Sequence, residues 1–263
     1  MPWRTVAMPF PVRQRGVERV PRIPYYEMPT PADGATNKRR IRVPGFGGAR
    51  PLRVDVHRSR APSGEGDTAA KRPVLVYMHG GAWVIGQKRY QGLPLLQALA
   101  ARGWVCFSVD YRLSPHATFP EHLVDVKRGL AWVRAHAAEY GGDPDFVLVA
   151  GNSAGAHLAS LAALTPNDPE YQPGFEHEDT RVDGCISLYG VYDFQDRHAR
   201  AANGGLAFLL EKIVMKLPRT SSRDAYAKAS PVDARVLVLE AGLVLGIVRR
   251  QRGQRGQVGA RAV

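Results

Sequence analysis

Cysteine is scarce in this chain of 263 residues, which contains only Cys106 and Cys185. Two cysteines cannot build the disulfide framework of a small secreted domain, and their separation matches no metal-binding pattern. Both lie inside apolar runs. We therefore expect two buried free thiols, no metal site and a reducing compartment.

Long hydrophobic runs are also missing. The longest run, residues 236–248, is interrupted by Glu240 and followed at once by arginine, so it falls short of the roughly 20 residues of a membrane helix. The first 20 residues contain prolines and arginines where a signal peptide needs an uninterrupted apolar stretch. We expect a cytoplasmic protein without a transmembrane segment.

Acidic residues are few at both ends of the chain. Residues 1–60 carry 13 Lys and Arg against 4 Asp and Glu, a charge of +9, and residues 241–263 carry 5 Arg and no acid, a charge of +5. Since the whole chain carries +12, residues 61–240 carry −2. A nucleic-acid-binding domain places basic side chains on its folded face, so this distribution argues against a nucleic-acid partner. Residues 249–263, rich in Arg, Gly and Gln, are expected to be a disordered basic tail.

The sequence does contain short apolar runs separated by helical patterns. Runs of this length, rich in Val, Leu and aromatics, are typical of strands buried on both faces of a parallel sheet. They are residues 74–78, 105–109, 146–150 and 185–188, and the helical patterns between and after them are residues 90–102, 121–140 and 154–164. Strands alternating with helices predict an α/β fold, a three-layer sandwich whose mainly parallel sheet has helices on both faces.

The flanking regions complete the predicted organisation. Residues 1–38 are expected to form an N-terminal coil or cap segment, and residues 39–248 the α/β domain. Within the domain we expect an antiparallel pair at 39–43 and 52–57, a lid-like insertion at about 192–230 with helices at 207–217 and 224–228, and a last strand at 234–239. A sheet that ends early has an exposed edge, which leaves pairing into a homo-oligomer open.

The strongest local motif is GNSAG at residues 151–155, which follows a predicted strand and opens a predicted helix. A sharp strand-to-helix turn projects its central side chain, here Ser153, and needs small residues on both sides. The serine then lies at a helix N-terminus, where the helix dipole stabilises a nearby anion. This pattern points to a nucleophile of acyl transfer.

A second motif, HGGAW at residues 79–83, directly follows another predicted strand. Its glycines let the backbone approach a bound carbonyl closely. The N–H groups of Gly80, Gly81 and Ala154 are therefore candidates for an oxyanion hole. His79 is expected to support the loop, and Trp83 is expected either to wall an acyl pocket or to belong to the core.

Together these motifs resemble those of the hormone-sensitive-lipase-like bacterial esterases and lipases of the α/β-hydrolase superfamily. HGGAW, DYRLSP at 110–115, Phe119-Pro120 and GNSAG follow the family's order, and the 74 residues between His79 and Ser153 are similar to its spacing. The resemblance covers about residues 72–233. It implies a carboxylic ester hydrolase that forms an acyl-enzyme on Ser153, with a Ser-acid-His triad, no cofactor and a small-molecule ester as substrate.

The chain departs from this family in its C-terminal part, where it lacks the expected acid and histidine. No aspartate follows Asp233, and the last histidine is His198. A serine hydroxyl without an adjacent base is a poor nucleophile near pH 7. The remaining candidate acids are Asp193 and Glu240, and the candidate base is His198. Of the other histidines, His157 is expected to pack beneath the serine turn, and these are expected at the surface or in loops: His116, His122, His136 and His177.

Three hypotheses follow. The first is a serine ester hydrolase whose activity is impaired because the family's acid and base are missing. The second is a non-catalytic small-molecule-binding protein on a hydrolase scaffold. The third is a truncated inactive product, because the basic tail resembles a GC-rich coding sequence translated out of frame from about Val232.

Overall fold

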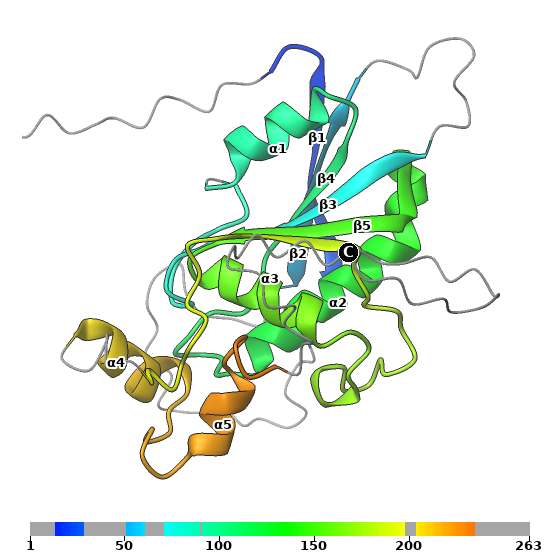
Figure 1. The fold of residues 1–263 in the computed structure, drawn as a ribbon. Coiled ribbons are helices and arrows are strands. Elements are labelled where there is room, and N and C mark those ends of the chain that lie inside the picture. Colours follow the sequence, from blue (N-terminus) through cyan, green and yellow to red (C-terminus); the bar gives the residue numbers. More distant parts are fainter. Residues whose placement is uncertain (1–13, 29–50, 61–70, 90, 198–203, 235–263) are drawn as a thin grey trace, which may run out of the picture.

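The computed structural model describes residues 14–28, 51–60, 71–89, 91–197 and 204–234, and in these residues six strands form one mixed sheet (Figure 1). The strands are β1 (Val17–Tyr26), β2 (Leu52–Ser59), β3 (Arg72–Met78), β4 (Val105–Val109), β5 (Gly142–Asn152) and β6 (Gly184–Leu188). Their order is β1-β2-β4-β3-β5-β6. The four strands from β4 to β6 are parallel, whereas β1 and β2 are each antiparallel to their neighbours.

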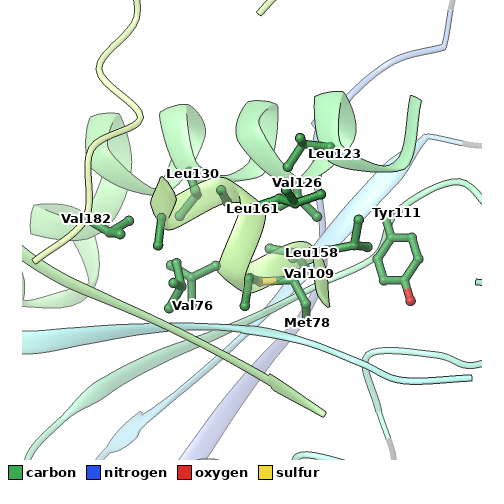
Figure 2. Packing of buried hydrophobic residues seen from close by; sticks show 14 of the residues in the cluster. Val76, Met78, Val109, Tyr111, Leu123, Val126, Leu130, Leu158, Leu161 and Val182 are labelled. Carbon is green, nitrogen blue, oxygen red and sulfur yellow. The ribbon is translucent and has the colours of Figure 1, made fainter. Parts of the chain in front are cut away.

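Helices cover both faces of this sheet (Figure 1). The helix α1 (Leu93–Ala100) lies on one side, and α2 (Glu121–His136), its 3-10 extension η1 (Ala137–Tyr140) and α3 (Ala154–Leu164) lie on the other. Alternate side chains of β3 serve the two faces, because successive residues of a strand point in opposite directions. Leu75 clusters with Leu96 of α1, whereas Val76 clusters with Leu158 of α3, as Figure 2 shows for the second face. The predicted three-layer sandwich is confirmed.

The strand register brings three loops to one end of the sheet. Met78 at the end of β3 pairs with Gly151 of β5, and Asn152 pairs with Leu188 at the end of β6. The loops that follow β3, β5 and β6 therefore adjoin one another. In parallel α/β sheets, ligands bind outside the carboxyl ends of the strands, so this is the end at which a site is expected.

A short 3-10 turn η2 (Pro169–Tyr171) precedes β6. After β6 the chain forms three short helical elements. They are α4 (Gly205–Leu209), a π-helical turn η3 (Leu210–Val214) and α5 (Arg223–Lys228), on the same side of the sheet as α2 and α3 (Figure 1). Val214 and Tyr226 are fully buried here, and the N–H of Phe119 donates to the carbonyl of Val214 at 3.0 Å. Helical structure is present in both stretches where helices were predicted, 207–217 and 224–228, although the bounds differ. The role of this segment as a lid stays a prediction.

Two expectations about strands are wrong. Residues 17–26 are not coil but form β1, the antiparallel partner of β2, and Arg19 anchors it by two hydrogen bonds to the buried carboxylate of Asp55. The last strands are also less buried than their apolar composition suggests. Phe146 is 41% exposed, and Ile186 and Leu188 are 38% and 40% exposed, because no described element covers the β5–β6 end of the α1 face.

Other expectations fall outside the described residues. They concern the strand at 39–43, the strand at 234–239 apart from Ala234, most of the N-terminal coil, Glu240, His198 and the tail at 249–263. In the ranges that are described, no helix has both the length and the apolar character to cross a membrane.

Candidate active site

Ser153 occupies a sharp turn between β5 and α3, as the GNSAG motif predicts. Its backbone has φ 51° and ψ −118°, a strained combination for a residue with a side chain, and its N–H donates to the carbonyl of Leu188 at 2.9 Å. A Cβ placed on Gly151 would lie 2.3 Å from the carbonyl oxygen of Gly155. The turn therefore requires glycine beside the serine, and Ser153 is left half-buried at the N-terminus of α3.

The HGGAW loop, residues 79–83, runs beside this turn. Gly81, Ala82 and Trp83 all have positive φ angles, of 122°, 53° and 59°. For a residue with a side chain this left-handed conformation costs about 1–2 kcal/mol, so Ala82 and Trp83 need surrounding contacts to hold it. A Cβ on Gly81 would lie 2.0 Å from the carbonyl oxygen of Ile85, which explains the glycine there.

The hydrogen bonds of this loop revise the predicted set of oxyanion donors. The N–H of Gly80 donates to the side-chain oxygens of Gln91, at 2.7 Å, and Asn152, at 3.1 Å. It is therefore engaged by protein atoms, contrary to the expectation that it faces a substrate. Within the described residues no hydrogen bond engages the N–H of Gly81, Ala82 or Ala154.

Asn152 ties the loop to the serine turn. Its side-chain oxygen accepts from the Gly80 N–H and from the hydroxyl of Tyr77, at 2.5 Å, and its amide nitrogen donates to Gln91 and to the hydroxyl of Tyr189. Burial raises the pKa of Tyr77, so its hydroxyl stays a donor. Sequence patterns did not single out Gln91 or assign a role to Tyr189, because each reaches Asn152 from a separate loop.

His79 is bonded to the HGGAW loop and stacked on a neighbouring ring. Its ring stacks on Tyr111 with centroids 4.5 Å apart, and its Nδ1 lies 2.7 Å from the carbonyl oxygen of Gly80, to which it donates. The Tyr111 hydroxyl donates to the His79 carbonyl at 2.8 Å. Burial lowers the pKa of His79, so the ring is neutral near pH 7. Trp83 is 1% exposed and therefore belongs to the core rather than to an open pocket wall.

Of the candidate acids and base, only Asp193 lies in the described residues, and no hydrogen bond joins its carboxylate to Ser153. The Asp193 carboxylate accepts from the backbone N–H groups of Gln195 and Arg197 and pairs with the Arg197 guanidinium, and these contacts lower its pKa despite partial burial. Within the described residues no histidine side chain is hydrogen-bonded to Asp193 or to the Ser153 hydroxyl.

The buried histidines have structural partners of their own. His157 lies in the core, as expected, bonded to Trp83 and to the carbonyl of Ala229. The expectation of a surface position is wrong for His122, which is fully buried on α2 and bonded to Ser114 at 3.1 Å. The apolar periodicity of α2 marks only one buried face of the helix. His122 lies outside that face but is buried as well, because α2 is covered on two sides. His116 and His177 are exposed, and His136 is half-buried at the end of α2.

No cluster of three or more His, Cys, Asp or Glu residues that could hold a metal occurs in the described ranges. Two cavities, of about 520 and 290 Å³, lie around the helical segment after β6 and do not include Ser153 among their lining residues. The distinctive geometry of this end of the sheet is thus a strained serine beside three backbone N–H groups.

The sequence profile of the family described as BD-FAE matches residues 64–234. The chain belongs to this family. Among curated proteins, it is 54% identical over 166 residues to the probable carboxylic ester hydrolase LipM of Mycobacterium tuberculosis, and 47% identical over 163 residues to esterase LipQ of the same organism. These matches cover 63% and 62% of this chain and 38% of each relative, so the chain spans about two fifths of their length.

Solved structures agree on the fold. Thermogutta terrifontis esterase 2 phosphonylated by sarin resembles this BD-FAE chain with a TM-score of 0.61 at 21% identity, over 86% of this chain and 70% of that one. A carbohydrate esterase from gut microbiota, in a truncated form, gives a TM-score of 0.55 at 22% identity, over 70% of this chain and 67% of that one. The α/β-hydrolase fold expected from the motifs is confirmed.

Proposed function

We propose that this chain carries the nucleophile and the oxyanion site of a serine hydrolase that acts on small carboxylic esters. One observation carries the proposal: the strained turn holds Ser153 next to the HGGAW loop, where the N–H groups of Gly81, Ala82 and Ala154 have no protein acceptor among the described residues. The esterase names of the mycobacterial relatives support it.

In this reaction the Ser153 Oγ attacks the ester carbonyl, and the electron pair of the carbonyl moves onto its oxygen. Gly81 and Ala154, with Ala82 in place of Gly80, donate hydrogen bonds to that oxyanion. The tetrahedral intermediate collapses, the alcohol leaves with a proton, and the acyl group stays on Ser153. Water then attacks the acyl-enzyme and releases the acid. No cofactor takes part in these steps.

The proposal includes a low turnover. The serine proton needs a base, and within the described residues no histidine side chain is hydrogen-bonded to the Ser153 hydroxyl. Catalysis by an oxyanion site and substrate binding alone amounts to roughly 10³–10⁴-fold over water. His198 as base, with Asp193 or Glu240 as acid, remains the alternative to be tested by substitution.

The test is hydrolysis of p-nitrophenyl butyrate by the wild-type chain, by Ser153→Ala and by Ser160→Ala. Ser160 is a matched control, since it lies two turns further along α3 and bonds to Ser187. A fluorophosphonate probe with mass spectrometry reports whether Ser153 reacts. We expect slow labelling of Ser153, retained in Ser160→Ala.

Fast hydrolysis that is lost in Ser153→Ala would contradict the low turnover and make His198→Ala and Asp193→Asn the next substitutions. Ester binding without any labelling of Ser153 would overturn the proposal in favour of a non-catalytic binding protein.

A further inference from the structure

His157 is joined by hydrogen bonds to the HGGAW loop on one side and to the segment after α5 on the other. The indole Nε1 of Trp83 donates to Nδ1 of His157 at 3.2 Å, and Nε2 of His157 donates to the carbonyl of Ala229 at 2.7 Å. Since an indole can only donate and a carbonyl can only accept, the imidazole must be neutral and carry its proton on Nε2. Both ring nitrogens are thereby engaged.

The surroundings keep this ring neutral and fixed. Phe194 stacks on it with centroids 4.4 Å apart and planes at 14°, and Trp83 meets it edge-on at 5.1 Å. His157 is fully buried, and burial lowers its pKa to about 4. The titratable group that faces it is His122 of α2, whose pKa is also lowered by burial, to about 3. The ring thus neither gains nor loses a proton near pH 7.

The position of His157 relates it directly to the nucleophile. It lies one turn after Ser153 on α3, and its backbone N–H donates to the Ser153 carbonyl at 3.1 Å. Its partner Trp83 is the last of three consecutive residues with positive φ. Two of these, Ala82 and Trp83, carry side chains that disfavour this conformation, so the loop would relax if Trp83 lost its anchor.

We propose that His157 is a positioning residue that acts through Trp83 to hold the N–H groups of Gly81 and Ala82 toward the oxygen of an ester bound at Ser153. This inference rests on the proposed function for its catalytic consequence, but the anchoring itself does not. Because oxyanion contacts strengthen in the transition state, loss of the anchor lowers kcat and leaves KM nearly unchanged.

Amide hydrogen exchange measures the anchoring without reference to catalysis. Within the loop the N–H groups of Val84 and Ile85 donate to the Gly81 carbonyl at 3.0 and 2.9 Å, so a peptide spanning residues 79–86 reports the loop's order. The variants are His157→Leu and Trp83→Phe, each of which removes the bond, and His157→Gln, which keeps an acceptor and a donor. We expect faster exchange of this peptide in the first two variants, and partial or full restoration in the third.

His136→Leu is the matched control. His136 also stacks on a tryptophan, Trp132, with centroids 4.3 Å apart, but it lies at the far end of α2. Peptides from β3 and β5 serve as internal references, so that a loss of overall stability is separated from local loosening. Unchanged exchange at 79–86 in both His157→Leu and Trp83→Phe, or an equal change in His136→Leu, would overturn the proposal.

The kinetic arm uses the Ser153-dependent hydrolysis of p-nitrophenyl butyrate. We expect kcat to fall by about tenfold or more in His157→Leu and in Trp83→Phe, with no further fall in the double variant, since loss of one oxyanion donor costs about 10²–10³ in kcat. Additive effects in the double variant would contradict a shared path through Trp83. If the wild-type chain shows no Ser153-dependent hydrolysis, the proposed function fails, while the exchange experiment still decides the anchoring.

Discussion

The carbonyl oxygen of Met78 lies where a side chain on Gly155 would have to go. A Cβ placed on Gly155 would come within 2.2 Å of that oxygen and within 2.5 Å of the carbonyl oxygen of His79. Both obstacles are backbone atoms at the end of β3, which cannot rotate away. The last glycine of the GNSAG motif is therefore what allows α3 to start against the HGGAW loop.

Substituting Gly155 by alanine should push the serine turn away from β3. We expect the free energy of unfolding to fall by about 1–3 kcal/mol, as for other overpacked cores, together with loss of Ser153 labelling by the fluorophosphonate probe. Gly205→Ala is the control, since a Cβ there meets nothing within 4 Å. Urea unfolding measures both. Equal free energies of unfolding in the two variants would show that the serine turn can shift to accommodate the added Cβ.

Removing the Asn152 side chain should leave the Tyr77 hydroxyl without its acceptor and the Gly80 N–H with one acceptor fewer. In Asn152→Leu, the buried hydroxyl of Tyr77 and the N–H of Gly80 both lose the same oxygen. Each unsatisfied buried donor costs about 1–3 kcal/mol, although Gly80 keeps Gln91 as a partner. We expect Asn152→Leu to destabilise the chain by about 2 kcal/mol in urea unfolding.

Tyr77→Phe supplies the control for this prediction, because it removes the donor that Asn152→Leu leaves without an acceptor. The double variant Asn152→Leu/Tyr77→Phe should be more stable than the sum of the two single effects predicts. Strict additivity would mean that the Tyr77 hydroxyl finds another partner when Asn152 is absent.

The local elements of the site could be predicted from sequence, but the partners that fix them could not. The strand, turn and helix around Ser153 follow from one continuous segment, residues 146–164, whose apolar run and small residues indicate them locally. The hydrogen bond from the Gly80 N–H to Gln91 does not follow from one segment, since it depends on how two loops meet. The strand β1 escaped prediction because Pro21 and Pro24 interrupt its alternation, and because its partner β2 lies about 35 residues away in the chain.

Forks of two hydrogen bonds from an arginine to an aspartate occur both in the interior and at the surface of the described residues. Arg112 donates through Nε and Nη2 to Asp125, which is fully buried, and Arg181 donates through the same atoms to Asp179, at an exposed site. Breaking a buried pair leaves an uncompensated charge and costs about 3–5 kcal/mol, whereas an exposed pair contributes about 0–1 kcal/mol. We therefore expect Arg112→Met to destabilise the chain severely and Arg181→Met to have little effect, in urea unfolding at pH 7. Similar losses in the two variants would contradict this account of burial.

The buried histidines should make stability depend on pH in a defined window. Burial lowers the pKa values of His57 and His157 to about 4, and that of His122 to about 3, from an unfolded value near 6.5. Between those values the unfolded chain binds more protons than the folded one, so the free energy of unfolding falls as pH falls from about 6.5 towards 4 and is constant above that range. One pKa unit corresponds to about 1.4 kcal/mol, so each histidine contributes a loss of a few kcal/mol across the window.

His157→Gln isolates one of these contributions, because glutamine does not titrate. Measured by urea unfolding at intervals from pH 7 to pH 4.5, the wild-type chain should lose stability more steeply than His157→Gln, and the two curves should become parallel above pH 7. His177→Gln is the control, since the His177 side chain is 79% exposed. Parallel curves for the wild type and His157→Gln would mean that His157 takes up a proton in the folded state, which its two hydrogen bonds, one accepted at Nδ1 and one donated from Nε2, do not permit.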